Sequence, residues 1–238
     1  MAQVLWLDDY ERAARLSRGL IALLPIPILV TAFGLNHNPV AAIVVSLVTA
    51  VGGPLVLAKY VRSRGRLLEG KLYTKWGGAP TTLLLTQDSS RTAGALQLQR
   101  RANVERVSQQ ILPATALPHG DREQSFFQAA VSTLRQKTYD QEVFPMVHAE
   151  NKSYGIERNS LAIRTEGRVI SGVGLLVAAG GWGLAASGHS NVNTSALAVA
   201  TAVIFVVLVF WIFWPTATRV RRAGDVYAEQ LLDASGNL

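Results

Sequence analysis

The sequence predicts an all-α membrane protein in which two transmembrane helical hairpins, four spans in total, flank a mainly helical cytoplasmic domain. Three observations lead to this fold class. Charged residues make up 16% of the 238 residues, whereas they make up about 25% of a typical soluble domain. The missing charges are excluded from two blocks, residues 19–58 and 169–218, which contain no Asp, Glu, Lys or Arg. The segment between these blocks places its apolar residues at helical spacing.

The lengths of the apolar runs predict membrane spans. Each block divides at a short polar turn, and the four resulting runs cover residues 20–35, 40–58, 169–186 and 196–214. A bilayer core of about 30 Å needs roughly 17 to 25 helical residues, a length that these runs reach or nearly reach. The alternative is a pair of buried hairpins in a soluble helical protein, but such long runs without ionisable groups are rare in water. A cleavable signal peptide fits poorly, because acids balance the bases before the first run and no A-x-A site ends it.

The positions of the cations predict the orientation of the spans. Residues 59–75 carry six Lys and Arg residues and one acid, and further arginines flank the other outer ends of the hairpins. Neither hairpin turn contains Lys or Arg. The positive-inside rule therefore predicts that both termini and the middle segment are cytoplasmic. The expected organisation is an N-terminal amphipathic segment (1–18), hairpin 1 (19–58), a cytoplasmic helical domain (59–168), hairpin 2 (169–214) and a cytoplasmic tail (215–238).

The third span is rich in small residues. The pairs Gly174/Ala178 and Ala179/Gly183 have the small-xxx-small spacing that lets helix backbones approach closely in lipid. We therefore expect these four residues to form a helix-packing face, either against the fourth span or against a second copy of the chain.

The other spans are distinguished by aromatic residues, helix breakers and missing charges. The fourth span ends in Trp211, Phe213 and Trp214, which predicts a lipid-facing helix with an aromatic anchor at the membrane interface. Pro25 and Pro27 predict a bend in the first span. No ionisable residue lies inside any span, which argues against an ion-coupled transporter but is compatible with a pore formed by several copies.

The middle segment carries the whole net charge of +7, because residues 59–168 contain 17 cations and 10 acids. Apolar spacing predicts helices over residues 90–111, 122–137 and 145–161, and another over residues 4–16 that could lie on the bilayer surface. Residues 81–86 fit either a strand or a helical turn.

The stretch KWGGAPTT, residues 75–82, is a candidate ligand or anion turn. A Gly-Gly pair followed by Pro and two hydroxyls is typical of a tight turn into a capped helix, and helix N-termini bind anions. The spacing of Gly and Lys fits neither a Walker A motif nor a dinucleotide fingerprint. Two interpretations stay open, a structural turn and a ligand cradle formed by Trp76, Gly77, Gly78, Thr81 and Thr82.

The polar stretch ENKSYGIERN, residues 150–159, precedes the third span. We interpret it as an elbow between the cytoplasmic domain and the membrane, with candidate residues Glu150, Asn151, Tyr154, Arg158 and Asn159.

With these two motifs the sequence resembles a family of uncharacterised bacterial four-span membrane proteins. The resemblance lies in the order of two spans, a basic stretch, WGGxPTT, a helical region, FP, ENxxYGxxRN and two further spans. It covers most of the chain. The resemblance implies a bacterial inner-membrane location and the four-span plan, and it implies no particular activity.

The residue composition limits the chemistry. With no cysteine, the chain has no disulfide, Cys-ligated metal site or thiol nucleophile, and its four histidines form no H-E-x-x-H zinc motif. We expect no cofactor and no metal. The cations Lys59, Arg62, Arg64, Arg66 and Lys71 suit contact with anionic lipid headgroups, and too few aromatic residues accompany them for nucleic-acid binding.

These features predict a non-enzymatic sensor or scaffold whose cytoplasmic domain binds a ligand or a protein and is coupled to a four-helix membrane bundle. The alternative is an oligomeric pore-forming effector of the defence or toxin type, and a membrane-bound enzyme is a third class. The sequence contains no catalytic motif that would support the enzyme.

Overall fold

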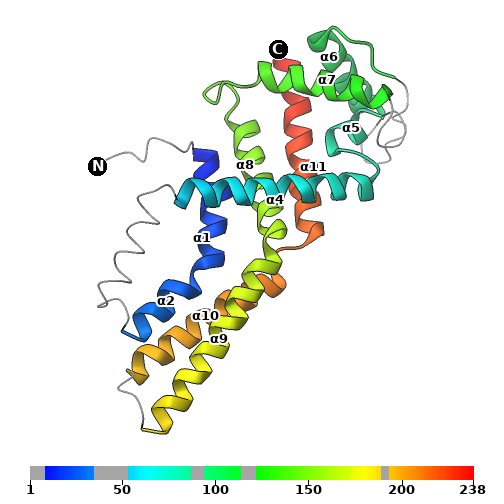
Figure 1. Cartoon of the computed structure of the whole chain (residues 1–238). Helices are drawn as coiled ribbons and strands as arrows, with labels where there is room; N and C mark the ends of the chain where they lie inside the picture. Colours follow the sequence, from blue (N-terminus) through cyan, green and yellow to red (C-terminus); the bar gives the residue numbers. More distant parts are fainter. Residues whose placement is uncertain (1–8, 35–52, 87–93, 114–121, 189–192) are drawn as a thin grey trace. The chain divides into compact units, whose positions relative to one another are not determined.

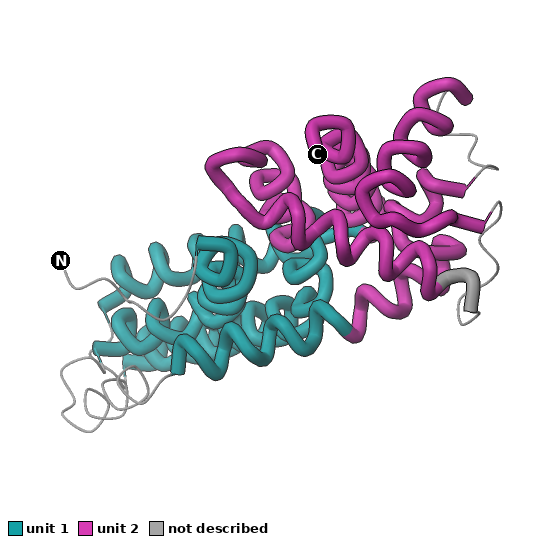
Figure 2. The backbone as a smooth tube through the Cα atoms, turned by 90° about the horizontal axis from the view of Figure 1, so that it is seen from above, with its two compact units in different colours: residues 1–66, 158–216 teal, residues 67–157, 217–238 magenta. Residues whose placement is uncertain are grey.

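The computed structural model of the chain describes residues 9–34, 53–86, 94–113, 122–188 and 193–238 (Figure 1). Every regular element within these ranges is helical, which confirms the all-α class. The chain forms two compact units (Figure 2). Unit 1 consists of Met1–Arg66 and Arg158–Thr216, and unit 2 consists of Leu67–Glu157 and Ala217–Leu238.

Three helical stretches are long and apolar enough to cross a membrane, namely Glu11–Ala32, Arg164–Ala186 and Thr194–Phe213. They correspond to the first, third and fourth runs of the sequence, so the protein has the helices of a membrane protein. The second run, residues 40–58, lies outside the described residues up to residue 52. Its last residues begin α4, which extends over Gly53–Trp76.

The first apolar helix of unit 1 is irregular. A π-helical turn, η1 (Glu11–Leu16), leads into α1 (Ser17–Leu23), and α2 (Pro25–Ala32) follows. Pro25 and Pro27 have no amide N–H and therefore cannot donate to the carbonyls one helical turn earlier. The α-helical pattern is interrupted at Leu24, directly before Pro25, in the part of the span where the sequence predicts a bend.

Helices α9 (Arg164–Ala186) and α10 (Thr194–Phe213) lie side by side as a hairpin (Figure 1). They pack through a row of small residues on α9. The buried residues of α9 recur every three or four positions and so share one face: Gly167, Ser171, Gly174, Ala178 and Gly181. A Cβ atom on Gly167 would lie 2.3 Å from the ring of Trp211 on α10. The absence of side chains on this face thus creates the space for the aromatic residue.

Trp211 is completely buried, so the prediction that it anchors the chain at the membrane interface is wrong for this residue. Its ring belongs to an apolar cluster with Ala22, Val61, Ile163 and Val207. The two other aromatic residues at the end of the fourth span are exposed, with Phe213 at 72% and Trp214 at 47%.

Arginines at the start of α9 hold the end of α10. Arg168 donates to the carbonyl oxygens of Trp211 (3.0 Å) and Ile212 (2.8 Å), and Arg164 donates to that of Pro215 (2.9 Å). The last carbonyls of a helix have no partner within the helix, and cations are favourable beside them. These bonds therefore fix the open end of the hairpin.

Unit 2 is built from short helices around an apolar core. It contains α5 (Pro80–Leu85), α6 (Gly94–Ser108), α7 (Arg122–Lys137) and α11 (Ala217–Asp233), which a 3-10 turn, η3 (Ala234–Asn237), follows. The last part of α4 and most of α8 (Pro145–Ala162) complete it. The largest fully buried side chains of its core are Leu85, Val104, Phe127, Leu134, Val220, Leu231 and Leu232.

The helices over 122–137 and from 145 onward are confirmed at the predicted positions, and residues 80–85 are helical. Residues 90–93 of the predicted helix over 90–111 lie outside the described residues, and the described part of this prediction contains a helix over Gly94–Ser108. The tail differs from the expectation of a separate segment, because α11 packs against α5 within unit 2.

Candidate ligand-binding site

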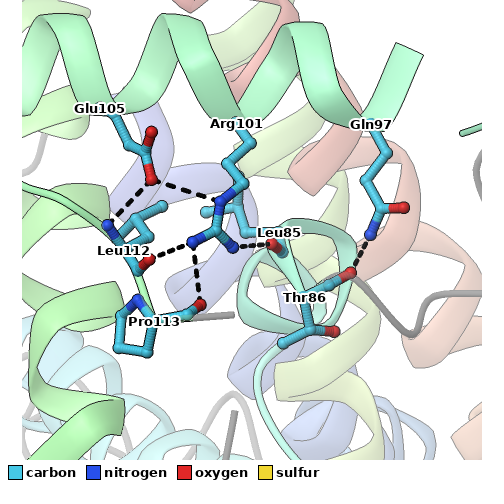
Figure 3. Close-up of polar contacts among 7 residues, drawn as sticks. All are labelled: Leu85, Thr86, Gln97, Arg101, Glu105, Leu112 and Pro113. Atoms are coloured by element: carbon cyan, nitrogen blue, oxygen red, sulfur yellow. Dashed lines mark hydrogen bonds and ion pairs between the residues drawn. The ribbon is translucent and has the colours of Figure 1, made fainter. Parts of the chain in front are cut away.

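A buried arginine fixes α5, the short helix that supplies part of the candidate site. Arg101 on α6 donates to the carbonyl oxygens of Leu85 (3.1 Å), Leu112 and Pro113 (2.9 Å) (Figure 3). Its Nε atom lies 3.2 Å from the carboxylate of Glu105, which also accepts a hydrogen bond from the amide of Leu112. The last carbonyls of a helix need partners outside the helix, and Arg101 supplies one. The position of α5 is therefore set by charge-assisted hydrogen bonds.

Two further arginines of α6 hold the end of the chain. Arg100 forms a bidentate pair with the Asp233 carboxylate, with N···O distances of 2.6 and 2.9 Å. Arg106 donates to the carbonyl oxygen of Ser235 at 3.2 Å. Paired N–H···O bonds of this kind fix orientation as well as distance. The C-terminal helix is thus attached firmly to the rest of unit 2.

A cavity of about 310 Å³ opens in unit 2 beside α5. Ligand pockets for small molecules begin at roughly this volume. The residues lining the cavity come from α4, α5, α7 and the turn before α5: Glu69, Tyr73, Ala79, Thr81, Thr82, Gln128, Val131, Ser132 and Arg135. Most of these side chains are polar, and one acid and one base are among them.

Two tyrosines orient the acid of the cavity. Glu69 accepts hydrogen bonds at Oε1 from Tyr73 (2.9 Å), one turn along α4, and from Tyr154 (2.8 Å) on α8. Burial raises the pKa of both tyrosines above the ordinary value of 10, and the nearby Glu69 charge raises the pKa of each further. Both hydroxyls therefore stay protonated as donors. The ring of Tyr154 also stacks on that of Tyr227, with centroids 6.2 Å apart.

The remaining polar groups of the cavity are less fully engaged. Thr81 and Thr82 are only 5% and 3% exposed. Their hydroxyls have no hydrogen-bond partner among the described residues, but the oxygen atoms are not fully buried, because both residues line the open cavity. The side chains of Gln128 and Ser132, which are exposed, likewise have none within the described ranges. Polar groups that face a cavity without a protein partner can bind water or a ligand there. The cavity therefore presents an unused set of donors and acceptors.

Arg135 is the base of the cavity. Its guanidinium lies 5.9 Å from the centroid of the Tyr227 ring, in a cation–π contact. It forms an ion pair with none of the carboxylates that the structure describes, Glu69 included. The cavity thus has an acid and a base that do not neutralise each other.

The candidate turn is divided between structure and site. Gly77 and Gly78 adopt φ values of 81° and 153°, which only glycine adopts without strain, and they end α4. Trp76 lies under the guanidinium of Arg221, 4.8 Å from its ring centroid. These three residues do not line the cavity, whereas the side chains of Thr81 and Thr82 do. Helix α5 has only six residues, so the dipole at its N-terminus is small. The polarity of the cavity therefore comes from side chains.

The candidate elbow is also divided. Tyr154 belongs to the cavity network, whereas Glu150 and Asn151 are half-buried outside the cavity lining. Asn159 donates to the carbonyl oxygen of Ala14 at 2.7 Å within unit 1. The Nε of Arg158 donates to the side-chain oxygen of Asn159 at 3.4 Å.

Asn159 packs against a glycine of α4. A Cβ atom on Gly65 would lie 2.2 Å from the side-chain oxygen of Asn159. The conformation and packing of the last two residues of the motif therefore depend on a missing side chain at position 65.

The predicted lipid-contact and packing residues lie in unit 1 or on α4. Lys59, Arg62, Arg66 and Lys71 are exposed, whereas Arg64 pairs with Glu166 at 2.8 Å. Of the packing residues, the structure buries Gly174 and Ala178 in the α9 face described above and leaves Ala179 and Gly183 exposed.

Sequence reasoning did not single out Glu69, Tyr73, Gln128, Ser132 or Arg135 as site residues. One signal for Glu69 was available, because it is the single acid in the basic stretch 59–75. The i,i+4 spacing of Glu69 and Tyr73 was a second. Positions 128, 132 and 135 carry no such signal, and α7 brings them to the cavity by its helical repeat alone.

No group of His, Asp and Glu suited to a metal ion occurs among the described residues. Comparison with known proteins adds no assignment: no family model matches the chain, and no curated protein or solved structure matches it significantly.

Proposed function

We propose that the protein is a multi-pass membrane sensor whose unit 2 binds a small polar ligand in the cavity beside α5. The observation that carries this proposal is the set of polar side chains that line the cavity without protein partners, two of them on the almost fully buried Thr81 and Thr82. Several polar side chains that converge on one cavity and have no protein partner are typical of a binding site. The role is non-enzymatic and needs no cofactor.

The chain itself offers a route from the ligand to the membrane helices. Helix α4 is continuous from Gly53 to Trp76 and contributes residues to both units. Glu69 and Tyr73 of this helix line the cavity, and Val61 of the same helix belongs to the apolar cluster of unit 1. A ligand that changes the position of Glu69 would therefore act on a helix that unit 1 also uses. Such coupling requires that the ligand bind two states of the helix differently.

A ligand screen on the full chain in detergent tests this proposal. We expect one or more small polar metabolites to raise the unfolding temperature, because a ligand that binds only the folded state stabilises it. The variant Thr81→Val with Thr82→Val should lose the response, and Thr74→Val, an exposed threonine of α4, should keep it. A metabolite panel that gives no shift at all, or the same shift in both variants, would contradict the proposal.

The proposed topology has four spans in a bacterial inner membrane, with unit 2 and both termini in the cytoplasm. Because the chain has no cysteine, single cysteines can report the side of the membrane directly. We expect an impermeant maleimide added to intact cells to label Ser187→Cys in the second hairpin turn and to leave Lys71→Cys unlabelled until the cells are opened. The reverse labelling would contradict this orientation.

The alternative function is an oligomeric pore, which the exposure of Ala179 and Gly183 on α9 favours, because small residues let helices of different copies approach. On this alternative, induction of the protein depolarises the membrane, and Gly183→Leu abolishes the effect. A sensor of the proposed kind leaves the membrane potential unchanged.

The exposed cations of α4 support a further part of the proposal, namely contact with anionic lipid headgroups. Lys59, Arg62, Arg66 and Lys71 are exposed, and each cation near an anionic leaflet contributes about 1 kcal/mol.

A further inference from the structure

We propose that the ligand of the unit 2 cavity is an uncharged molecule with several hydroxyl groups, a monosaccharide or a cyclic polyol of similar size. The hydroxyls of Thr81 and Thr82 bind it from the wall that α5 forms. This inference rests on the proposed function, because it names the class of ligand for the same cavity.

The first step is the position of the two threonines in their helix. Other helical threonines of unit 2 donate their hydroxyls to the carbonyl one turn earlier, as Thr74 and Thr133 do at 3.0 and 3.1 Å. Thr81 and Thr82 are the second and third residues of α5, so the residues one turn earlier belong to the preceding turn and to no helix. Their hydroxyls have no hydrogen-bond partner among the described residues, and both residues line the cavity.

The second step is the kind of group that these hydroxyls can bind. A threonine hydroxyl is both a donor and an acceptor. A ligand hydroxyl also donates and accepts at a single atom, whereas a carboxylate only accepts and an ammonium group only donates. Thr81 and Thr82 are 5% and 3% exposed, so the cavity is where their hydroxyls meet a partner. Two adjacent groups of this kind match a ligand with hydroxyls on neighbouring carbon atoms.

The third step is the state of the charged groups in the lining. Glu69 accepts hydrogen bonds from Tyr73 and Tyr154, at 2.9 and 2.8 Å, and has a further partner as well. Arg135 is exposed to solvent, and its guanidinium lies 5.9 Å from the centroid of the Tyr227 ring. Neither charge therefore depends on a ligand for its partner. An uncharged ligand leaves these contacts as they are, whereas a charged ligand would have to compete with them.

The fourth step concerns the rest of the lining. Ala79 and Val131 are apolar, and the side chain of Tyr73 is held in place by the hydrogen bonds of its hydroxyl. Such groups suit the C–H surface of a small ring. The exposed side chains of Gln128 and Ser132 complete the lining and add polar groups. The cavity volume of about 310 Å³ lies at the lower end of small-molecule pockets, which favours a single sugar ring over a nucleotide.

Isothermal titration of the full chain tests the inference with defined probes. Nanodiscs are used because many detergents carry sugar head groups that could occupy the cavity. D-ribose, D-glucose and myo-inositol represent the proposed class. D-glucuronate adds a carboxylate to the sugar, D-glucosamine adds an ammonium group, cyclohexanol keeps one hydroxyl, and malonamide is neutral without hydroxyls. We expect at least one of the first three probes to bind, and each of the other four to bind at least about tenfold more weakly, which corresponds to about 1.4 kcal/mol.

Two double variants and one matched control complete the test. Thr81→Val with Thr82→Val removes both hydroxyls and should weaken binding of the sugar or polyol at least about tenfold. Thr81→Ser with Thr82→Ser keeps both hydroxyls and should bind within about threefold of the natural protein. Thr74→Val removes an exposed hydroxyl that donates to the Gly70 carbonyl, and it should leave binding unchanged. Circular dichroism checks that each variant keeps its helices.

The outcomes separate this inference from the proposed function. A charged probe, cyclohexanol or malonamide that binds as tightly as the best of the three neutral polyhydroxyl probes overturns the ligand class. Binding of a sugar or polyol that the double valine variant retains overturns the role of the threonines. Absence of binding by all three polyhydroxyl probes overturns the inference as well, and only a failure of the wider metabolite screen would overturn the proposed function too.

Discussion

The two units of the chain both contain arginine hydrogen bonds to carbonyl oxygens, but they differ in how their helices approach each other. In unit 1, α9 presents small residues so that bulky neighbours can approach, as Gly167 does for Trp211 and Gly181 does for Phe33. In unit 2, buried arginines join the short helices through hydrogen bonds to carbonyl oxygens and carboxylates, as Arg101 and Arg100 do. Lipid gives apolar surfaces no drive to associate, so close van der Waals packing has to stabilise helices there, whereas a domain in water can also use charged networks.

The comparison explains where a ligand site is found. The packing face of α9 is filled by side chains from α10 and from α2 with its end residue Phe33. In unit 2 the polar network satisfies the groups around Arg101 but leaves the hydroxyls of Thr81 and Thr82 without partners. Fully buried side-chain atoms without a partner occur elsewhere in the described residues, for example at Ser171 and Trp211 of unit 1. The threonine hydroxyls differ from these atoms because they face a cavity that a ligand can enter.

The largest expected effect comes from removing the arginine hydrogen bonds that hold unit 2. Arg101→Met removes the donor to Leu85, Leu112 and Pro113 and leaves the carboxylate of Glu105 without its cation. Removing one member of a buried ion pair costs roughly 3 kcal/mol or more. Chemical unfolding in detergent, followed by circular dichroism, should show this loss. Arg222→Met is the control and should unfold as the natural protein does; equal stability of the two variants would mean that Arg101 does not hold unit 2.

The next effect comes from filling the space that a glycine of α9 leaves for a neighbouring side chain in unit 1. Gly167→Ala places a methyl group where the Trp211 ring now lies, 2.3 Å away. Overpacking of a tight contact costs about 2 kcal/mol. The matched variant is Gly172→Ala on the same helix, where a Cβ meets nothing within 4 Å. We expect the thermal midpoint in detergent to fall for the first variant and to stay or rise for the second, since alanine favours helix more than glycine. A fall in both would point to the helix backbone and not to Trp211.

A smaller effect is expected from removing one of the hydrogen bonds to the acid of the cavity. Tyr154→Phe removes one of the two donors to Glu69 and should cost about 1.5 kcal/mol near neutral pH, because a hydrogen bond to a charged group is lost. Tyr139→Phe, at an 81% exposed tyrosine, is the control.

The pH dependence of this difference has a definite sign. The pKa of Tyr154 is raised in the folded protein, so its contribution is complete below the unfolded pKa of about 10 and declines as the pH rises above that value. Unfolding free energies of the natural protein and Tyr154→Phe should therefore converge above about pH 10. A difference that stays constant through this range would contradict the buried donor.

The smallest effect concerns the exposed cations of α4. Replacing Lys59, Arg62 and Arg66 by Gln should reduce the stability gain from anionic over neutral lipid by about 1 kcal/mol per charge. Thermal unfolding in nanodiscs with and without phosphatidylglycerol measures it. Arg64, which is paired with Glu166, should contribute less. An equal gain in the natural protein and the triple variant would exclude headgroup contact at these residues.

The sequence predicted those parts of the fold that depend on local periodicity. The apolar stripe of residues 122–137 and the breaker-bounded stretch from Pro145 define helices that the structure has at the same positions. The apolar runs likewise indicate three of the membrane helices. These features are readable because a helix repeats its pattern within a few residues.

The site was less predictable, because its residues meet only through the tertiary fold. Glu69 and Tyr154 are 85 positions apart, and nothing in either segment indicates the other. The burial of Trp211 was missed for a related reason, since the deciding feature is the absence of a side chain at Gly167 on another helix. The KWGGAPTT segment forms the expected turn into a helix, but no side chain caps that helix, and of the five candidate residues only the two threonines line the cavity.

The central claim is that the open hydroxyls of Thr81 and Thr82 serve a ligand and not the fold. The most direct test measures the unfolding temperature of the full chain and of the double variant Thr81→Val, Thr82→Val, each without ligand and with the probes that bind. Valine has nearly the same shape but no hydroxyl, so the account predicts that the variant without ligand is as stable as the natural protein or more so, and that the ligand-induced shift disappears. A variant that is less stable without ligand but keeps the full shift would contradict the claim.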